Sequence, residues 1–233
     1  MANTVPSFVH IAITPLPSDK VVTLNGQADI LILAPSCIGP YTKDCYLNPL
    51  LVNTYSLGYY FNMYIGGTPL LKQGGAVVVV NDMPYAWDSP AHDCYREFFE
   101  QVWRHCRAAY VDSGDDAYDT QVVQPHGALD EFERYQQAFV DNEQLNDNYR
   151  NGLSPGGVHG FYMYTWAAHG MDKVGKVFVV GATDPRGPNA LNWEMHSTVV
   201  DAVAAAKEWL GKPDAQVTYL RAPPVGYAKV EAA

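Results

Sequence analysis

Three short runs of continuous apolar residues constrain the fold of this 233-residue sequence more than any other feature. The runs are "ADILILAP", "GAVVVV" and "KVFVVGA". A strand with one solvated face alternates apolar and polar residues, whereas a strand buried on both faces reads as an unbroken apolar run. The runs therefore predict central strands of a sheet that is at least partly parallel and is covered on both faces.

Helical patterns lie between these runs. A helix is expected over residues 50–64 and would end at Gly66-Gly67, and an amphipathic helix is expected in "AHDCYREFFEQVWRHC". The alternation predicts an α/β fold with a Rossmann-like sheet flanked by helices in a single domain over 1–233. The acidic stretch 112–151 is expected to be a helical insertion. The strands expected to be neighbours in one sheet are 29–34, 76–81, 176–181 and 216–220.

Composition excludes several classes of function. A formal net charge of -10 argues against binding to nucleic acid and to anionic membranes. The apolar runs are much shorter than the roughly 20 residues of a membrane-spanning helix. The first residues lack the basic and apolar regions of a signal peptide, so a cytoplasmic location is expected. The four cysteines form no CxxC pair, no HExxH or HxxxH pair exists, and no metal site is predicted for this chain alone.

The loops that follow the predicted strands are the first places to look for a site. In an open α/β sheet, ligands bind beyond the carboxyl ends of the strands. These loops contain no GxGxxG, GxxxxGK[ST] or GxSxG motif. They do carry polar side chains suited to a small-molecule substrate. Asn48 ends the loop after the first run, and Asp82 follows the second run.

Two histidines are candidates for acid–base chemistry. His92 follows Asp82 and Asp88 in the loop after the second run, where carboxylates would tune its pKa. The other reading of His92 is an ordinary structural residue. His159 follows the turn "SPGG", which cannot easily continue a helix. A helix is therefore expected to begin close to His159, and its N-terminus would keep the imidazole neutral near pH 7.

The helix expected after His159, in "HGFYMYTWAAHG", is rich in aromatic residues. Aromatic side chains would cover most of its circumference, which favours a helix buried in the core. In the alternative reading, Tyr164 and Trp166 line a pocket wall and contribute their polar groups, the hydroxyl and the indole N–H, to it. The interpretation that combines the two is a core helix whose first turn borders a site.

Several of these segments resemble the C-terminal domain of nickel-dependent lactate racemase and its longer uncharacterised relatives. The likeness spans about residues 28–224 in the same order. Its most specific part is "NPLLVNTYSLGYYFNMYIGGTPLLKQGGAVVVV", which joins a helix, a double-glycine turn and a strand. The resemblance implies a two-domain enzyme in which this domain closes a cleft. A separate N-terminal half would carry a nickel-pincer nucleotide tethered to a lysine, and the reaction would pass a hydride to the cofactor and back.

The sequence departs from the racemase pattern at two positions. The family's Tyr-Gln-x-x-Lys run is matched here by Tyr55 to Tyr59, so Ser56 replaces the glutamine and Tyr59 replaces the lysine. Both side chains are expected to face an open cleft near Asp82. A neutral phenol gives no charge-assisted anchor for a carboxylate, so a hydroxy compound other than lactate is the expected substrate. The rival reading is a non-catalytic interaction or structural module that kept the fold.

Overall fold

Six strands form one all-parallel sheet with the order β1-β8-β3-β5-β6-β7. The computed structural model describes residues 8–11, 21–35, 48–61, 64–65, 68–103, 129–220 and 227–231. The strands are β1 (Phe8–Ile11), β3 (Ala28–Leu33), β5 (Leu71–Val80), β6 (Val174–Val180), β7 (Glu194–His196) and β8 (Val217–Leu220). The predicted α/β fold is confirmed, and the four strands expected to be neighbours are the adjacent strands β8, β3, β5 and β6.

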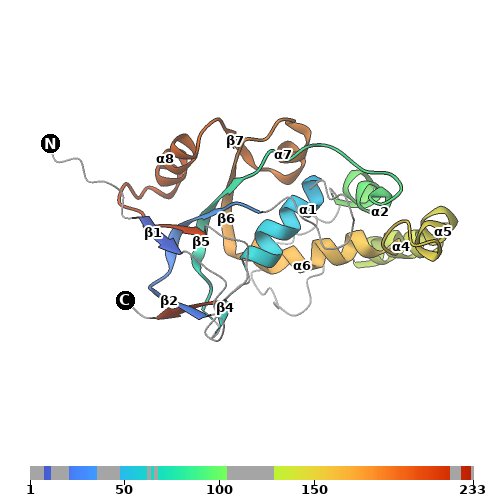
Figure 1. Ribbon diagram of the computed structural model, residues 1–233, viewed down its shortest axis with the longest axis horizontal. Helices are drawn as coiled ribbons and strands as arrows, with labels where there is room; N and C mark the ends of the chain where they lie inside the picture. The colour runs from blue at the N-terminus through green and yellow to red at the C-terminus, as the bar shows by residue number, and fades with distance from the viewer. Residues whose placement is uncertain are drawn as a thin grey trace.

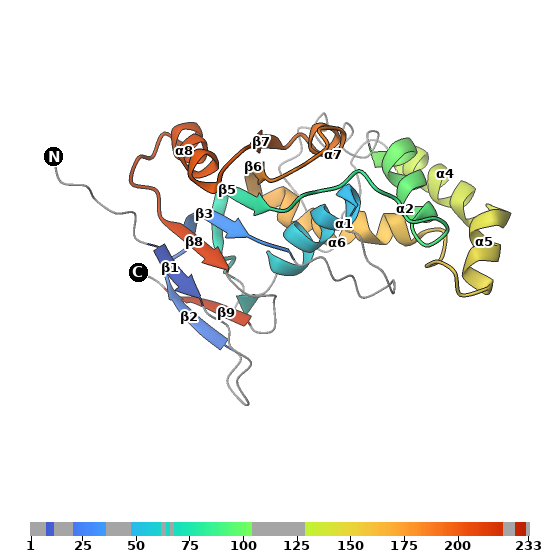
Figure 2. The same cartoon turned by 45° about the horizontal axis from the view of Figure 1, so that its top comes forward.

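Helices cover both faces of this sheet (Figure 1 and Figure 2). Helix α1 and helix α6 lie on one side, and α8 lies on the other. The helical elements are α1 (Pro49–Asn53), η1 (Thr54–Tyr60), α2 (Asp93–Glu97), η2 (Phe98–Val102), α4 (Leu129–Val140), α5 (Glu143–Arg150), α6 (His159–Lys173), α7 (Arg186–Leu191) and α8 (Val199–Leu210). The elements η1 and η2 are π-helical and directly continue α1 and α2.

The unbroken apolar runs are explained by this two-sided cover. Successive side chains of a strand point to opposite faces of the sheet. In β3, Leu31 packs into the core beneath α1 and α6, whereas Ile30 packs into the core beneath α8. Val77 and Val78 divide in the same way in β5. Both faces of the central strands are therefore buried from water, as their sequence predicts.

Helices α4 and α5 form an arm at the end of the molecule farthest from α8 (Figure 1). The arm packs on the start of α6, where the rings of Phe139 and Phe161 meet edge to face with centroids 5.2 Å apart. The predicted acidic insertion over 112–151 is helical at 129–140 and 143–150. Residues 112–128 lie outside the described residues.

A second, three-stranded parallel sheet has the order β2-β9-β4. It contains β2 (Val21–Asn25), β9 (Tyr227–Glu231) and β4 (Tyr64–Ile65). The helix expected over 50–64 is therefore shorter than predicted, because Tyr64 joins this sheet. Among the described residues, no helix is long and apolar enough to cross a membrane.

Candidate functional site

Two fully buried polar side chains, Asn48 and His92, meet where α1 begins. The Asn48 side chain caps α1, because its Oδ1 accepts a hydrogen bond of 2.9 Å from the N–H of Leu51. This cap orients the amide so that Nδ2 lies 3.4 Å from Nδ1 of His92. Since an amide nitrogen can only donate, Nδ1 of His92 is the acceptor and the imidazole proton is on Nε2.

His92 is held neutral in this environment. Burial lowers the pKa of His92, although the nearby carboxylates of Asp88 and Asp93 act in the opposite direction. Its Nε2 is buried and has no hydrogen-bond partner in the described part of the chain. A buried donor without a partner costs roughly 1–3 kcal/mol, so the fold tolerates His92 in this position at a cost.

Tyr95, one turn after His92, connects this pair to His159. The ring of Tyr95 lies 5.7 Å from that of His92, and its hydroxyl lies 2.9 Å from Nδ1 of His159. Helix α6 begins at His159, so the predicted position in the first turn is confirmed. Burial lowers the pKa of His159. This lowered pKa agrees with the neutral imidazole expected from the sequence. The physical cause of the lowered pKa is desolvation, whereas the expected cause was the helix N-terminus.

From His159 an aromatic band runs along α6 to η1. We use this name for Tyr162, Trp166, Tyr59 and Tyr55, which follow one another by ring contact. The centroid distances along the band are 5.1 Å for Tyr162–Trp166, 4.6 Å for Trp166–Tyr59 and 5.1 Å for Tyr59–Tyr55. His159 joins the band at Tyr162, with ring centroids 5.4 Å apart.

Gly58 makes the contact between α6 and η1 possible. A Cβ atom at this position would lie 2.5 Å from Cδ1 of Trp166, closer than packed atoms approach. The absence of a side chain lets the indole lie against η1 and stack on Tyr59. The glycine that interrupts the predicted helix is therefore a packing requirement at the band.

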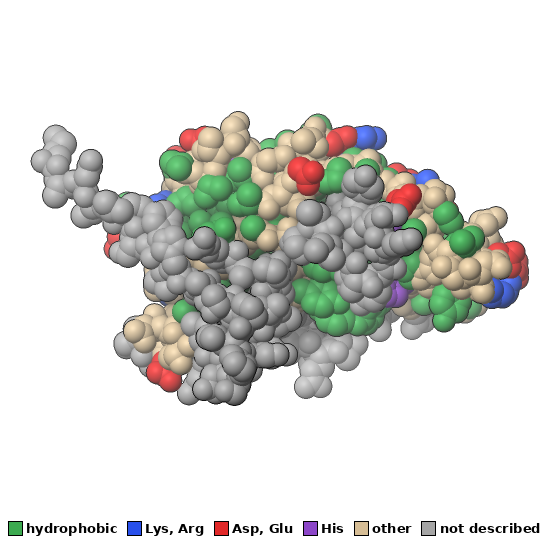
Figure 3. All heavy atoms as spheres, viewed as in Figure 1, with side chains coloured by type: hydrophobic (Ala, Val, Ile, Leu, Met, Phe, Trp, Pro, Cys, Tyr) green, Lys and Arg blue, Asp and Glu red, His purple; other side chains and the backbone are tan. Residues whose placement is uncertain are grey.

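Helix α6 combines the two readings left open by its sequence. The side chains of Phe161, Met163 and Tyr164 are at most 2% exposed and belong to the core. Tyr162, by contrast, is 45% exposed. In Figure 3 a hydrophobic area extends over this face of the molecule and has a histidine at its border. The helix is core on one side and lines a surface on the other.

Two of the predicted site residues are not part of this arrangement. The prediction that Ser56 faces an open cleft is wrong: Ser56 is 0% exposed, because η1 is covered from Thr54 to Gly58, and its Oγ has no described partner. Asp82 is exposed at the end of β5. Its carbonyl oxygen accepts hydrogen bonds from the N–H and the hydroxyl of Thr183, and its carboxylate contacts neither candidate histidine.

The remaining candidates do come together. Asn48, His92 and His159 are linked through Tyr95, and Tyr59 and Trp166 are linked to them through Tyr162. Tyr59 is partly exposed, as expected for a residue at a surface.

Tyr95 is the functional candidate that sequence reasoning missed. It lies in the segment "AHDCYREFFEQVWRHC", for which the sequence predicts an amphipathic helix, and it is 0% exposed. The sequence feature that could have identified it is its position three residues after His92, since residues three apart share a helix face. Which partner its hydroxyl would find could not be predicted, because His159 is 64 residues further along the chain.

Other groups in the described residues offer less chemistry. Burial raises the pKa of the Cys94 thiol to about 12, so it remains protonated and is a poor nucleophile. No group of three or more His, Cys, Asp or Glu side chains in the described residues is placed to hold a metal ion.

Comparisons with known proteins add no assignment to this geometry. No protein-family model matches the sequence, and no curated protein matches it.

Proposed function

We propose that this chain is a racemase- or epimerase-like domain that acts on a small hydroxy compound. In this proposal it closes a site that a separate, cofactor-bearing N-terminal half completes. The observation that carries the proposal is the hydrogen bond between Tyr95 and His159 in the first turn of α6, beside an aromatic band. The resemblance to the closing domain of nickel-dependent lactate racemase supports the same reading.

The role proposed for His159 is to hold or move a proton at the substrate. Its lowered pKa keeps it neutral at pH 7, as a group that both accepts and donates protons must be for much of the time. Tyr95 engages Nδ1, and the proton transfer is assigned to the other ring nitrogen, Nε2. Tyr95 fixes the ring orientation and, with His92 behind it, acts as a positioning residue.

The aromatic band is proposed to bind the substrate's carbon skeleton. Tyr59 stands where the racemase pattern has a lysine, and its ring is stacked between Tyr55 and Trp166. This arrangement favours apolar contact and hydrogen bonding over an ion pair. A hydroxy compound with an uncharged or ring-bearing substituent suits it better than lactate.

The resemblance implies a nickel-pincer nucleotide on the other half, which would supply a hydride acceptor when bound. The described residues of this chain include no metal-holding group, so we assign them no part in holding that cofactor and derive no step through it. Their contribution is limited to binding, orienting and proton transfer.

A rival proposal is a non-catalytic interaction module, and one observation favours it. Large apolar side chains are exposed around the arm and the start of α6: Tyr149 at 61%, Leu153 at 52% and Val158 at 40%. Such side chains would suit a protein partner as well as a closing half.

The test measures inversion and binding in parallel. The purified chain is mixed with a cofactor-loaded N-terminal half of a lactate racemase and a panel of enantiopure 2-hydroxy acids and esters. Chiral chromatography follows inversion, and imidazole NMR signals of the chain alone follow binding. We expect His159→Gln to abolish inversion and the binding shifts, whereas His196→Gln on β7 keeps both. If no compound is inverted and none shifts the His159 signal, the enzyme proposal fails.

A further inference from the structure

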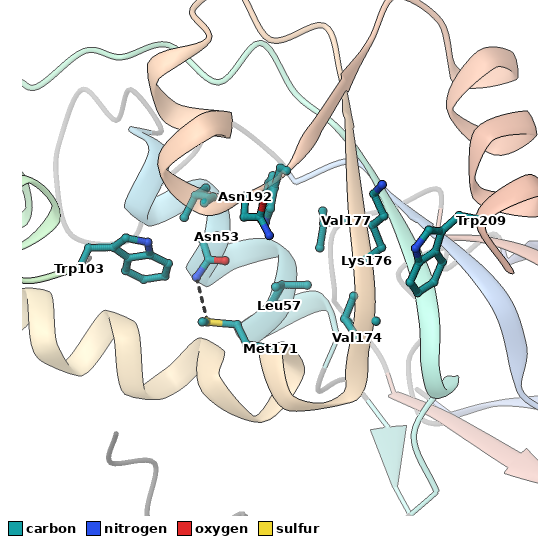
Figure 4. Close-up of a pocket in the computed structure, with 12 residues that line it drawn as sticks. Asn53, Leu57, Trp103, Met171, Val174, Lys176, Val177, Asn192 and Trp209 are labelled. Carbon is teal, nitrogen blue, oxygen red and sulfur yellow. Dashed lines mark hydrogen bonds between the residues drawn. The ribbon is translucent and has the colours of Figure 1, made fainter. Parts of the chain in front are cut away.

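A cavity of about 310 Å³ lies beside the first half of β6, apart from the histidine cluster and the aromatic band (Figure 4). Residues from α1, α6, α7 and α8 surround it. It lies at the amino end of β6, whereas the loops searched for a site follow the carboxyl ends of the strands. Its volume is at the lower limit of the range for small-molecule sites, about 300–1,000 Å³.

The strand that forms one wall of this cavity has an open edge. Strand β7 pairs with β6 only from Phe178 onward, so no described strand pairs with this side of residues 174–177. The carbonyl of Val180 faces β5, because it accepts the N–H of Asn81. Alternate residues of a strand face opposite neighbours, so the N–H of Val177 points to the open edge. The register shift opposite Gly75 and Ala76 places a bulge at Gly175, also in the wall.

Asn53 brings an amide to the cavity. Its side chain is 1% exposed, and its single hydrogen bond in the described residues is a weak one of 3.6 Å from Nδ2 to Sδ of Met171. Its Oδ1 has no partner there. Figure 4 shows this oxygen turned away from Met171, into the space bordered by Asn192 and Val177. This oxygen borders the cavity, where water or a bound molecule can donate a hydrogen bond to it.

Asn192, an exposed residue, supplies a second amide to the lining. It ends α7 in the left-handed conformation, with φ 58°, which favours glycine and asparagine. Its side-chain amide makes no hydrogen bond to another described residue. Together, Asn53 and Asn192 offer two donors and two acceptors to a molecule between them.

Most of the accessible lining is polar, and its aromatic side chains are three tryptophans. Trp103, Trp193 and Trp209 all contribute to it, and Trp209 is 44% exposed. A Cβ atom on Gly175 would lie 2.5 Å from Cη2 of Trp209, so this glycine lets the indole lie against the strand edge. The one charged lining residue, Lys176, forms an ion pair with Glu194.

We propose that this cavity binds an uncharged, flat nitrogen heterocycle of the nucleobase class, as a free base or a nucleoside. Asparagine amides match the adjacent donor and acceptor on such a ring, as in recognition of adenine. Indole side chains stack on the faces of bases. The paired charge of Lys176 leaves no cation for a phosphate, which disfavours nucleotides. This site is independent of the proposed racemase-like function.

The test titrates the purified chain with adenine, adenosine and AMP by calorimetry, and records the indole N–H and side-chain amide NMR signals. We expect adenosine to bind and to shift the Trp209 and Asn192 signals, and AMP to bind no more tightly. Asn192→Gly keeps the left-handed backbone, and Asn53→Leu removes a weakly bonded amide, so both variants should fold. Each should weaken adenosine binding at least tenfold.

The control variant is Arg150→Gln on α5, an exposed side chain that does not line the cavity, which should bind adenosine as the natural chain does. Asn53→Leu should also unfold at the same or a higher temperature, because replacing a weakly bonded buried polar group with an apolar one is neutral or stabilising. The proposal is overturned if no probe binds at millimolar concentration, if both variants bind adenosine normally, or if indole binds as tightly as adenine.

Discussion

At the scale of single residues, Asn48 controls the protonation of its neighbour. Its Oδ1 is used by the N–H of Leu51, so its Nδ2 is the group that meets His92. This leaves the proton of His92 on a buried Nε2. Nδ1 of His159 is engaged by the hydroxyl of Tyr95, which can either donate or accept. The position of the proton is therefore fixed by geometry at His92.

The first prediction concerns pH. Burial lowers the folded-state pKa of both His92 and His159, while the unfolded chain titrates near the ordinary value of about 6.5. Protonation therefore favours unfolding, and stability falls as the pH drops below about 6.5. In urea unfolding between pH 7.5 and pH 5, His92→Gln should show a shallower loss than the natural chain. The double variant with His159→Gln should be shallower still, and equal slopes would contradict this account.

A second prediction tests Ser56. Its hydroxyl is fully buried and has no described partner, so Ser56→Ala removes an unpaired polar group. We expect the free energy of unfolding to stay within about 0.5 kcal/mol or to rise by about 1 kcal/mol. A loss of more than 1 kcal/mol in chemical denaturation would show that the hydroxyl has a partner in the folded chain.

At the scale of elements, the sequence predicted that helices exist but not how they are wound. The helix at 50–64 becomes π-helical after Asn53, where the N–H of Phe61 bonds to the carbonyl of Ser56. The same occurs in η2, where Trp103 bonds to Phe98. Apolar periodicity cannot predict such wide turns, because they are stabilised by packing on α6 and not by local preference. The widened turns also explain why Ser56 is buried although its neighbour Tyr59 is not.

The close contact of α6 with η1 gives the third prediction. Gly58→Ala would place a methyl group against Trp166, and we expect a loss of about 1–3 kcal/mol in the free energy of unfolding. The matched control is Gly156→Ala, since a Cβ there has no neighbour closer than 4.0 Å. The control should stay within about 0.5 kcal/mol of the natural chain. Equal stabilities of the two variants in denaturant melts would refute the packing role of Gly58.

At the scale of the whole molecule, the parallel sheet was predictable and the site only in part. Unbroken apolar runs identify strands that are buried on both faces, and such strands form parallel sheets. The second sheet was not predictable, because β4 has only two residues and β9 is at the far end of the chain. His159 was found through the turn before α6. Tyr95 was not, because its bond to His159 depends on how α2 and α6 pack.

The fourth prediction concerns Asp29, which joins three strands at the amino end of the sheet. Its carboxylate accepts hydrogen bonds from Lys72 Nζ at 2.9 Å, Lys212 Nζ at 3.1 Å and the N–H of Gln216 at 2.9 Å. These partners come from β5 and from the residues before β8, so one side chain at the start of β3 connects distant parts of the chain. Burial raises the pKa of Asp29, but the bond from Gln216 and the two ammonium groups outweigh it and lower the pKa overall.

Because the folded-state pKa of Asp29 is lowered, its contribution to stability is complete above the unfolded value of about 3.9 and is lost as the pH falls through the folded value. At pH 7 we expect Asp29→Asn to lose about 2–3 kcal/mol, because the amide cannot accept charge-assisted bonds from both lysines. Lys72→Met is the control: the Lys72 side chain is 46% exposed and Lys212 remains, so this variant should lose less than about 1 kcal/mol. Urea melts should show the gap between Asp29→Asn and the natural chain closing as the pH falls below 4. A gap that is absent at pH 7, or that stays constant down to pH 2, would show that the carboxylate does not connect the strands.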